Sequence, residues 1–293
     1  MPSNFVERRW KSADGLDLSA RDYAAVAGQA RLPVIAIHGL TRNAADFEVI
    51  APQIALAGRR VLAVDVRGRG RSDRATDPMT YQPATYAQDV LALMSALGIE
   101  RAVFIGTSMG GLITMAIAAI RSKVVAGAIL NDIGPEVSPV GLARITSYAG
   151  QAVEIHSWAD AAAHARRLND VAFPHYTDAD WEAFARRTFR IGTEGTPVPD
   201  YDPDIAVPIR AAGAGAKALV PNLWPMFGRL TRGRQVLLIR GETSDLLSPE
   251  IVAKMRKRAP KMDYVEVPGV GHAPMLDEPA VKEALFPFLS ELP

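Results

Sequence analysis

Hydrophobic and polar residues follow two recurring patterns along this chain. Short, predominantly apolar runs occur at Pro33–Ile37, Arg60–Val64, Ala102–Ile105 and Val124–Leu130. Longer segments with the periodicity or composition of helices alternate with them, at Ala45–Ala57, Thr85–Leu97 and Leu112–Ile120. A strand that is apolar throughout is buried on both faces, and strands that alternate with helices form a parallel sheet covered on both sides. The pattern therefore predicts an α/β fold.

Both ends of the chain extend this sheet. Phe5–Trp10 and Leu16–Tyr23 alternate around Asp14-Gly15, which predicts an antiparallel hairpin at a sheet edge. Late in the chain, strands are expected at Gln235–Ile239 and Tyr264–Val267, and helices at Pro249–Arg258 and Glu278–Leu292.

The strand pattern is interrupted in between. From about Pro135 to Arg232 the sequence predicts helical segments, with capping boxes at Ser157–Asp160 and Thr177–Asp180, and no core strand. We therefore expect a core domain of residues 1–134 and 233–293, and a helical cap, or lid, of residues 135–232 inserted between two strands.

A nucleophile motif joins one buried strand to the helix after it. Gly106-Thr107-Ser108-Met109-Gly110 matches G-x-S-x-G, in which small residues let strand and helix approach closely while the turn raises the serine hydroxyl above the sheet. The N–H of Met109 would start the helix, where partial positive charge can meet an oxyanion. A phosphate-binding loop is excluded, because no Lys-Ser/Thr follows the glycines.

A serine nucleophile needs a base and an orienting carboxylate. Of five histidines, only His272 lies in a glycine-flanked loop after a late core strand. Asp245, Asp132 and Glu242 each follow a predicted strand and could reach the same sheet edge. Asp245 is favoured, because it gives the chain order Ser, Asp, His. Asp132 is the main alternative.

Other candidate residues surround this set. The turn after Pro33–Ile37 should supply a second oxyanion donor, the backbone N–H of Leu40, and beside it His38 either packs against backbone or contacts substrate. Trp224, near the return from the cap, is a candidate for the pocket wall. The arginine-rich loop 67–74 includes Asp73 and follows Asp65, which favours a self-paired structural loop over phosphate or nucleic-acid binding.

Composition narrows the function. The 293 residues carry a formal net charge of +1, which gives no electrostatic case for nucleic-acid or membrane-surface partners. The absence of cysteine excludes disulfides and thiolate metal sites, and without an H-E-x-x-H or dinucleotide motif we expect neither a metal nor a cofactor. The first residues lack the apolar run of a signal peptide and no later stretch could span a bilayer, so a cytoplasmic location is expected.

These motifs together resemble the α/β-hydrolase superfamily, in a form with a helical cap. The resemblance covers almost the whole chain and rests on His38-Gly39, Asp65-x-Arg67-Gly68-x-Gly70-x-Ser72, the Ser108 motif, Gly241-x-x-x-Asp245 and Gly271-His272. It implies a mostly parallel, predominantly eight-stranded sheet with helices on both faces. It also implies a catalytic triad of Ser108, Asp245 and His272, with the N–H groups of Leu40 and Met109 as oxyanion hole.

The nucleophile limits the activities that this resemblance implies. Similar haloalkane dehalogenases and epoxide hydrolases use an aspartate where this chain has Ser108. We therefore expect a small-molecule substrate, a small carboxylic ester or lactone, hydrolysed through an acyl-enzyme. Carbon–carbon bond hydrolysis of a meta-cleavage product is the first alternative, although Leu40-Thr41-Arg42-Asn43 is less glycine-rich than is usual there. A non-catalytic receptor that retains the hydrolase pocket is the second.

Overall fold

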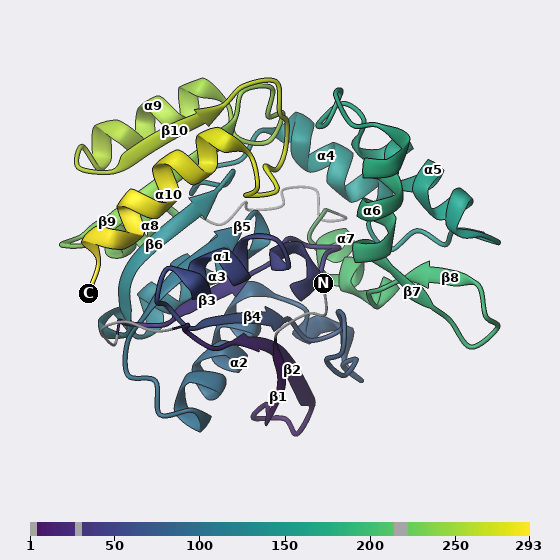
Figure 1. Ribbon diagram of the computed structural model, residues 1–293, viewed down its shortest axis with the longest axis horizontal. Helices are drawn as coiled ribbons and strands as arrows, with labels where there is room; N and C mark the ends of the chain where they lie inside the picture. Colours follow the sequence, from purple (N-terminus) through teal and green to yellow (C-terminus); the bar gives the residue numbers. More distant parts are fainter. Residues whose placement is uncertain (1–4, 27–30, 214–221) are drawn as a thin grey trace.

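An eight-stranded sheet forms the centre of the molecule (Figure 1), in the order β1-β2-β4-β3-β5-β6-β9-β10. The computed structural model describes residues 5–26, 31–213 and 222–293. The strands are β1 (Val6–Lys11), β2 (Asp17–Tyr23), β3 (Val34–Ile37), β4 (Val61–Asp65), β5 (Ala102–Thr107), β6 (Val125–Asn131), β9 (Gln235–Gly241) and β10 (Asp263–Val267). Strand β2 pairs antiparallel with β1 and β4, and all other neighbours are parallel. The predicted fold class and edge hairpin are confirmed.

Helices cover both faces of this sheet, as its apolar strands require. They are α1 (Ile50–Leu56), α2 (Pro83–Ala96), α3 (Met109–Ile120), α8 (Trp224–Thr231), α9 (Pro249–Arg258) and α10 (Pro279–Glu291). Along β5, Phe104 packs into the core with α2, α3, α8 and α9, whereas Val103 and Ile105 face α1 and α10. This alternation explains why the strand is apolar throughout, since neither face meets water.

Between β6 and α8 the chain forms helices outside the sheet. They are α4 (Pro139–Tyr148), α5 (Trp158–Asn169), α6 (Asp178–Thr188) and α7 (Val207–Gly213), with a separate hairpin of β7 (Phe189–Ile191) and β8 (Pro197–Pro199). Figure 1 shows α4 to α7 grouped beside the sheet. Side chains of Phe173, Trp181 and Phe184 form a small core of their own here.

Side-chain caps begin two of these helices, as the sequence predicts. The Ser157 hydroxyl accepts from the Asp160 N–H at the start of α5. Thr177 and Asp180 form a reciprocal capping box at the start of α6. Each cap satisfies an N–H group that has no partner within its helix.

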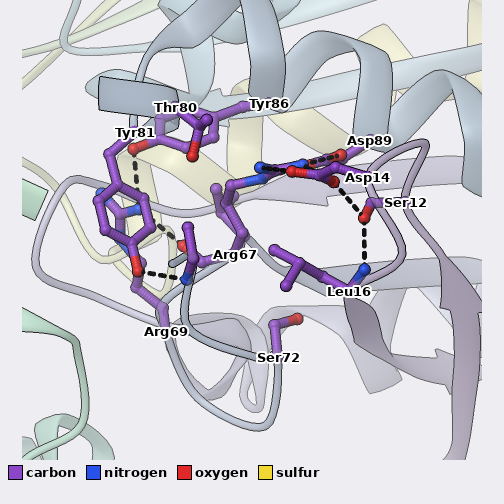
Figure 2. A network of polar contacts seen from close by, with 12 residues as sticks. Ser12, Asp14, Leu16, Arg67, Arg69, Ser72, Thr80, Tyr81, Tyr86 and Asp89 are labelled. Carbon is purple, nitrogen blue, oxygen red and sulfur yellow. Dashed lines mark hydrogen bonds and ion pairs between the residues drawn. The ribbon is translucent and has the colours of Figure 1, made fainter. Parts of the chain in front are cut away.

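The arginine-rich loop after β4 is structural, but it is not self-paired. Arg67 forms ion pairs with Asp89 on α2 and with Asp14 in the β1–β2 turn, each at 2.7 Å (Figure 2). Asp65 and Asp73 instead accept backbone N–H groups, including those of Ala44 and Asp17 respectively. The loop is therefore held by distant parts of the chain. Within the described ranges, no helix is long and apolar enough to cross a lipid bilayer.

Candidate active site

The turn between β5 and α3 presents Ser108 in a strained backbone conformation. Its φ is +50°, in the left-handed region that few residues other than glycine adopt. A Cβ on Gly106 would overlap the backbone of Gly110, and one on Gly110 would overlap the carbonyl of Ile37. Only glycine fits at both positions, so the helix can start directly behind the strand with the serine at its tip.

His272 lies between this serine and a buried carboxylate. Its Nε2 is 2.9 Å from Ser108 Oγ, and its Nδ1 is 2.7 Å from an oxygen of Asp132. With the proton on Nδ1, the ring donates to the carboxylate and Nε2 accepts the serine hydroxyl. The three side chains thus form one continuous chain of hydrogen bonds, the arrangement that activates a serine hydroxyl.

Asp132 is oriented by groups from the neighbouring strand. It directly follows β6, with a φ of +56° that turns its side chain back across the sheet edge. Its fully buried carboxylate accepts from the Ser244 hydroxyl at 2.6 Å and from the Gly241 N–H at 3.1 Å, besides His272. These bonds satisfy the buried carboxylate oxygens and fix their orientation.

The expectation that Asp245 orients His272 is not met by the geometry. Asp245 lies four residues beyond the end of β9 and pairs in a bidentate manner with Arg144 of α4, at 2.5 and 2.9 Å. Hydrogen bonding to Arg144 lowers the pKa of its carboxyl. The third carboxylate, Glu242, accepts from the Gly269 N–H at 2.7 Å. Asp132, the alternative acid in the sequence analysis, therefore occupies the place beside His272.

His38 supports the backbone of the turn after β3 and does not line the cavity. It is fully buried, its Nε2 accepts the Val66 N–H at 3.1 Å, and its Nδ1–H donates to the Gly39 carbonyl at 2.7 Å. Burial lowers the pKa of His38 to about 4, so the ring is neutral at physiological pH. Of the two alternatives for His38, the geometry agrees with packing against backbone and not with substrate contact, because both ring nitrogens already bond to backbone groups.

A cavity of about 80 Å³ lies over Ser108 and His272. Its floor includes Leu40, Ser108 and His272, and its roof includes Tyr148 of α4 and Phe184 of α6. In the part of the chain that the structure describes, neither Leu40 nor Met109 donates its N–H to a protein acceptor. Two backbone donors next to the serine are thus available to a ligand oxygen, as an oxyanion hole requires.

Trp224 does not line this cavity. It is the first residue of α8, where its ring packs edge-on to Phe227, with ring centroids 5.9 Å apart. The guanidinium of Arg258, from α9, lies 4.3 Å from the ring centroid. Helix α8 packs against α3 in the core, so the expectation of a pocket-wall tryptophan is wrong.

Sequence reasoning did not single out Ser244 or Arg144. Ser244 is a loop serine next to the favoured acid and has no distinctive spacing. Arg144 lies on a cap helix, and its partner is 101 residues away in the sequence. Across residues 5–26, 31–213 and 222–293, no cluster of three or more His, Asp or Glu side chains could hold a metal ion.

Comparison with known proteins agrees with this architecture. The model of the Alpha/beta hydrolase family matches residues 34–283. A 3-hydroxybutyrate-oligomer hydrolase from Cupriavidus necator is 37% identical over 256 residues, which are 84% of each chain. A 2-(acetamidomethylene)succinate hydrolase from Mesorhizobium japonicum is 29% identical over 80% of this chain and 79% of its own.

A solved structure extends the agreement to nearly every residue. An alpha/beta hydrolase from Novosphingobium aromaticivorans superposes with a TM-score of 0.91 and 43% identity, and the match covers 99% of both chains. Fold, sequence relatives and family match therefore agree, and the chain belongs to the alpha/beta hydrolase family.

Proposed function

We propose that this hydrolase cleaves small carboxylic esters through an acyl-enzyme on Ser108. The observation that carries the proposal is the hydrogen-bond chain from Ser108 through His272 to Asp132, at 2.9 and 2.7 Å. It supplies a nucleophile, a base and an orienting carboxylate in the geometry that acyl transfer needs. Asp132 replaces Asp245 as the proposed acid.

The residues then act in two half-reactions. Ser108 Oγ attacks the ester carbonyl while His272 Nε2 takes its proton, and the N–H groups of Leu40 and Met109 hold the oxyanion. As the carbon–oxygen bond breaks, His272 returns the proton to the leaving alkoxide. Water then attacks the acyl-enzyme with His272 as base again, so that acid and alcohol are the net products.

The substrate class follows from the cavity and the relatives. A volume of about 80 Å³ favours a short acyl group over a long chain. The relative from Cupriavidus necator is named as a hydrolase of 3-hydroxybutyrate oligomers, which are esters of a short hydroxy acid. We extend the proposal to short oligoesters of this kind, and to lactones of similar size.

The predicted cap of residues 135–232 would close over this site, apart from α8, which packs against α3 in the core. Tyr148, Asn169, Phe173 and Phe184 come from it and line the cavity above Ser108. Closure over bound substrate would exclude water and add apolar contact with the acyl chain.

A substrate panel with a nucleophile variant tests the proposal. We expect turnover of p-nitrophenyl acetate or butyrate and of the 3-hydroxybutyrate dimer, with a burst of p-nitrophenol equal to the enzyme concentration wherever deacylation is slow. Ser108→Ala should fold normally and lose at least roughly a thousandfold in turnover. A fluorophosphonate should label Ser108 alone.

Three outcomes would contradict it. Labelling of another serine, or full activity in Ser108→Ala, would remove the assigned nucleophile. Turnover only of a meta-cleavage product would favour carbon–carbon hydrolysis. Stoichiometric binding of these ligands without turnover would favour a receptor.

A further inference from the structure

Arg69 is a buried cation that pairs with no carboxylate among the described residues. Only 1% of its surface is exposed, yet within the described ranges it forms no ion pair, whereas its neighbours Arg67 and Arg71 both pair with carboxylates. Figure 2 shows Arg69 close to Tyr81 and Tyr86, and its guanidinium lies 5.6 and 5.1 Å from their ring centroids. Burial raises the pKa of Tyr86, so this phenol stays neutral and provides no balancing charge.

The hydrogen bonds of Arg69 lead to the oxyanion hole. Its Nε donates to the Leu40 carbonyl at 3.0 Å, and its Nη2 lies 3.6 Å from Met109 Sδ. Its Nη1 donates to the Arg67 carbonyl at 2.8 Å and to the Tyr86 hydroxyl at 2.9 Å. One side chain thus contacts both residues whose N–H groups are proposed to hold the oxyanion.

These contacts restrain the direction of the Leu40 N–H. In a planar trans peptide the N–H points opposite to the carbonyl of the preceding residue. That carbonyl, of Gly39, accepts from His38 Nδ1 at 2.7 Å, and the next carbonyl, of Leu40 itself, accepts from Arg69. Both peptides that flank Leu40 are therefore held before substrate binds.

The placement of this charge also calls for an explanation. Removing a guanidinium from water is costly unless something compensates for it. Arg59 is equally buried, but it donates to carbonyls near the end of α10, including those of Leu289 and Leu292, where a helix terminus favours a cation. Arg69 has no such terminus, whereas a negative charge develops beside it whenever an ester carbonyl is attacked.

We propose that Arg69 is a positioning residue of the oxyanion hole, which fixes Leu40 and Met109 and whose charge favours the oxyanion. The inference rests on the proposed function, because it needs acyl transfer at Ser108. Arg69 does not touch the substrate itself. It acts through the two residues that do.

The experiment compares two buried arginines that form no ion pair with an Asp or Glu side chain in the described ranges. Arg69→Met should lower kcat for p-nitrophenyl butyrate roughly ten- to a hundredfold, and KM should change by less than about twofold. This loss is smaller than the roughly hundred- to thousandfold that is typical when an oxyanion-hole donor itself is removed. Arg59→Met, far from the site, should leave kcat unchanged. Arg69→Lys, which keeps the charge, should recover part of the loss.

An inhibitor pair separates this role from a merely structural one. A butyryl trifluoromethyl ketone forms a tetrahedral oxyanion adduct with the serine, whereas the matching secondary alcohol cannot. The inhibition constant of the ketone should rise in Arg69→Met by about the factor lost in kcat/KM, while that of the alcohol stays the same. Thermal unfolding of each variant checks that the protein is folded at the assay temperature, so that the inhibition constants of folded proteins are compared.

Several results would overturn the inference. Equal weakening of ketone and alcohol, a rise in KM alone, or the same kcat loss in Arg59→Met would each reduce Arg69 to a packing role. If Arg69→Met does not fold, Arg69→Lys decides, since an unchanged ketone affinity in that variant would refute the need for guanidinium bonding to Leu40. Activity in Ser108→Ala would instead refute the proposed function itself.

Discussion

Replacing Asp132 by asparagine should abolish most activity while nearly preserving the fold. Asparagine has the same size, and its amide oxygen can still accept from the Gly241 N–H. Its NH₂ group cannot accept from His272 Nδ1–H, so the ring would turn to the other tautomer, with its proton on Nε2 facing Ser108. That nitrogen could then no longer take the serine proton.

The expected fall in kcat follows from the loss of His272 as a base. By analogy with other triads, kcat should fall roughly ten-thousandfold, which corresponds to about 5 kcal/mol of transition-state stabilisation. The matched variant, Asp245→Asn, breaks only the pair with Arg144, whose side chains are 28% and 23% exposed. Solvent screening limits that pair to about 1 kcal/mol or less of stability, so kcat should change by less than about threefold.

Three measurements on the two variants decide between the carboxylates. They are kcat/KM for p-nitrophenyl butyrate, the rate at which a fluorophosphonate labels Ser108, and the thermal midpoint. Both kcat/KM and the labelling rate should fall strongly in Asp132→Asn and stay close to the wild-type values in Asp245→Asn. If Asp245→Asn were the inactive variant with its fold intact, the hydrogen bond from His272 to Asp132 would not be the catalytic one.

Three further outcomes test the surroundings of the site. The pKa of His38 is lowered to about 4 from 6.5, so its contribution to stability is complete above pH 6.5 and is lost as the pH falls toward 4. Between pH 8 and pH 5, urea unfolding should show a loss of about 2 kcal/mol in the wild type that His38→Gln lacks. Arg59→Met leaves carbonyls near the end of α10 without a donor, so it should lower the free energy of unfolding by about 2 kcal/mol and Tm by roughly 3 °C at unchanged kcat. Ile145→Ala widens the cavity from α4, so kcat/KM should shift from acetyl toward longer acyl esters; an unchanged ratio would show that Ile145 does not contact the acyl chain.

The sequence was sufficient for the sheet and for the strand–turn–helix unit that carries Ser108, because both depend on neighbours along the chain. Apolar runs must be strands buried on both faces, and the glycines beside Ser108 are required by contacts within one strand–turn–helix unit. His272 could be found because few histidines compete with it. The structure places it within hydrogen-bond distance of Ser108, and its role as a base stays a prediction for the variants to test.

The acid could not be decided in the same way. Parallel strands bring Asp132 and Asp245 to the same edge of the sheet, so strand order alone allows either. The structure separates them through the backbone of Asp132, whose left-handed φ turns it inward, and through Arg144, which holds Asp245 toward the cap. Trp224 was misplaced for a related reason. Its aromatic side chain suits a pocket wall and a core equally well. In the structure it is half-buried against the core, in contact with Phe227 and Arg258.

The contacts of the loop after β4 are likewise hard to predict from the sequence. Its arginines stand two residues apart and look alike in the sequence, yet each holds a different part of the molecule. Arg67 joins the edge hairpin to α2, and Arg69 joins the Leu40 turn to the start of α3. The backbone N–H of Gly70 donates to the backbone carbonyl of Asp200, directly after β8, at 3.1 Å. Composition can predict that such a loop is ordered, because so many charges need partners. It cannot assign the partners, because each of them is brought to the loop by a different strand, helix or turn.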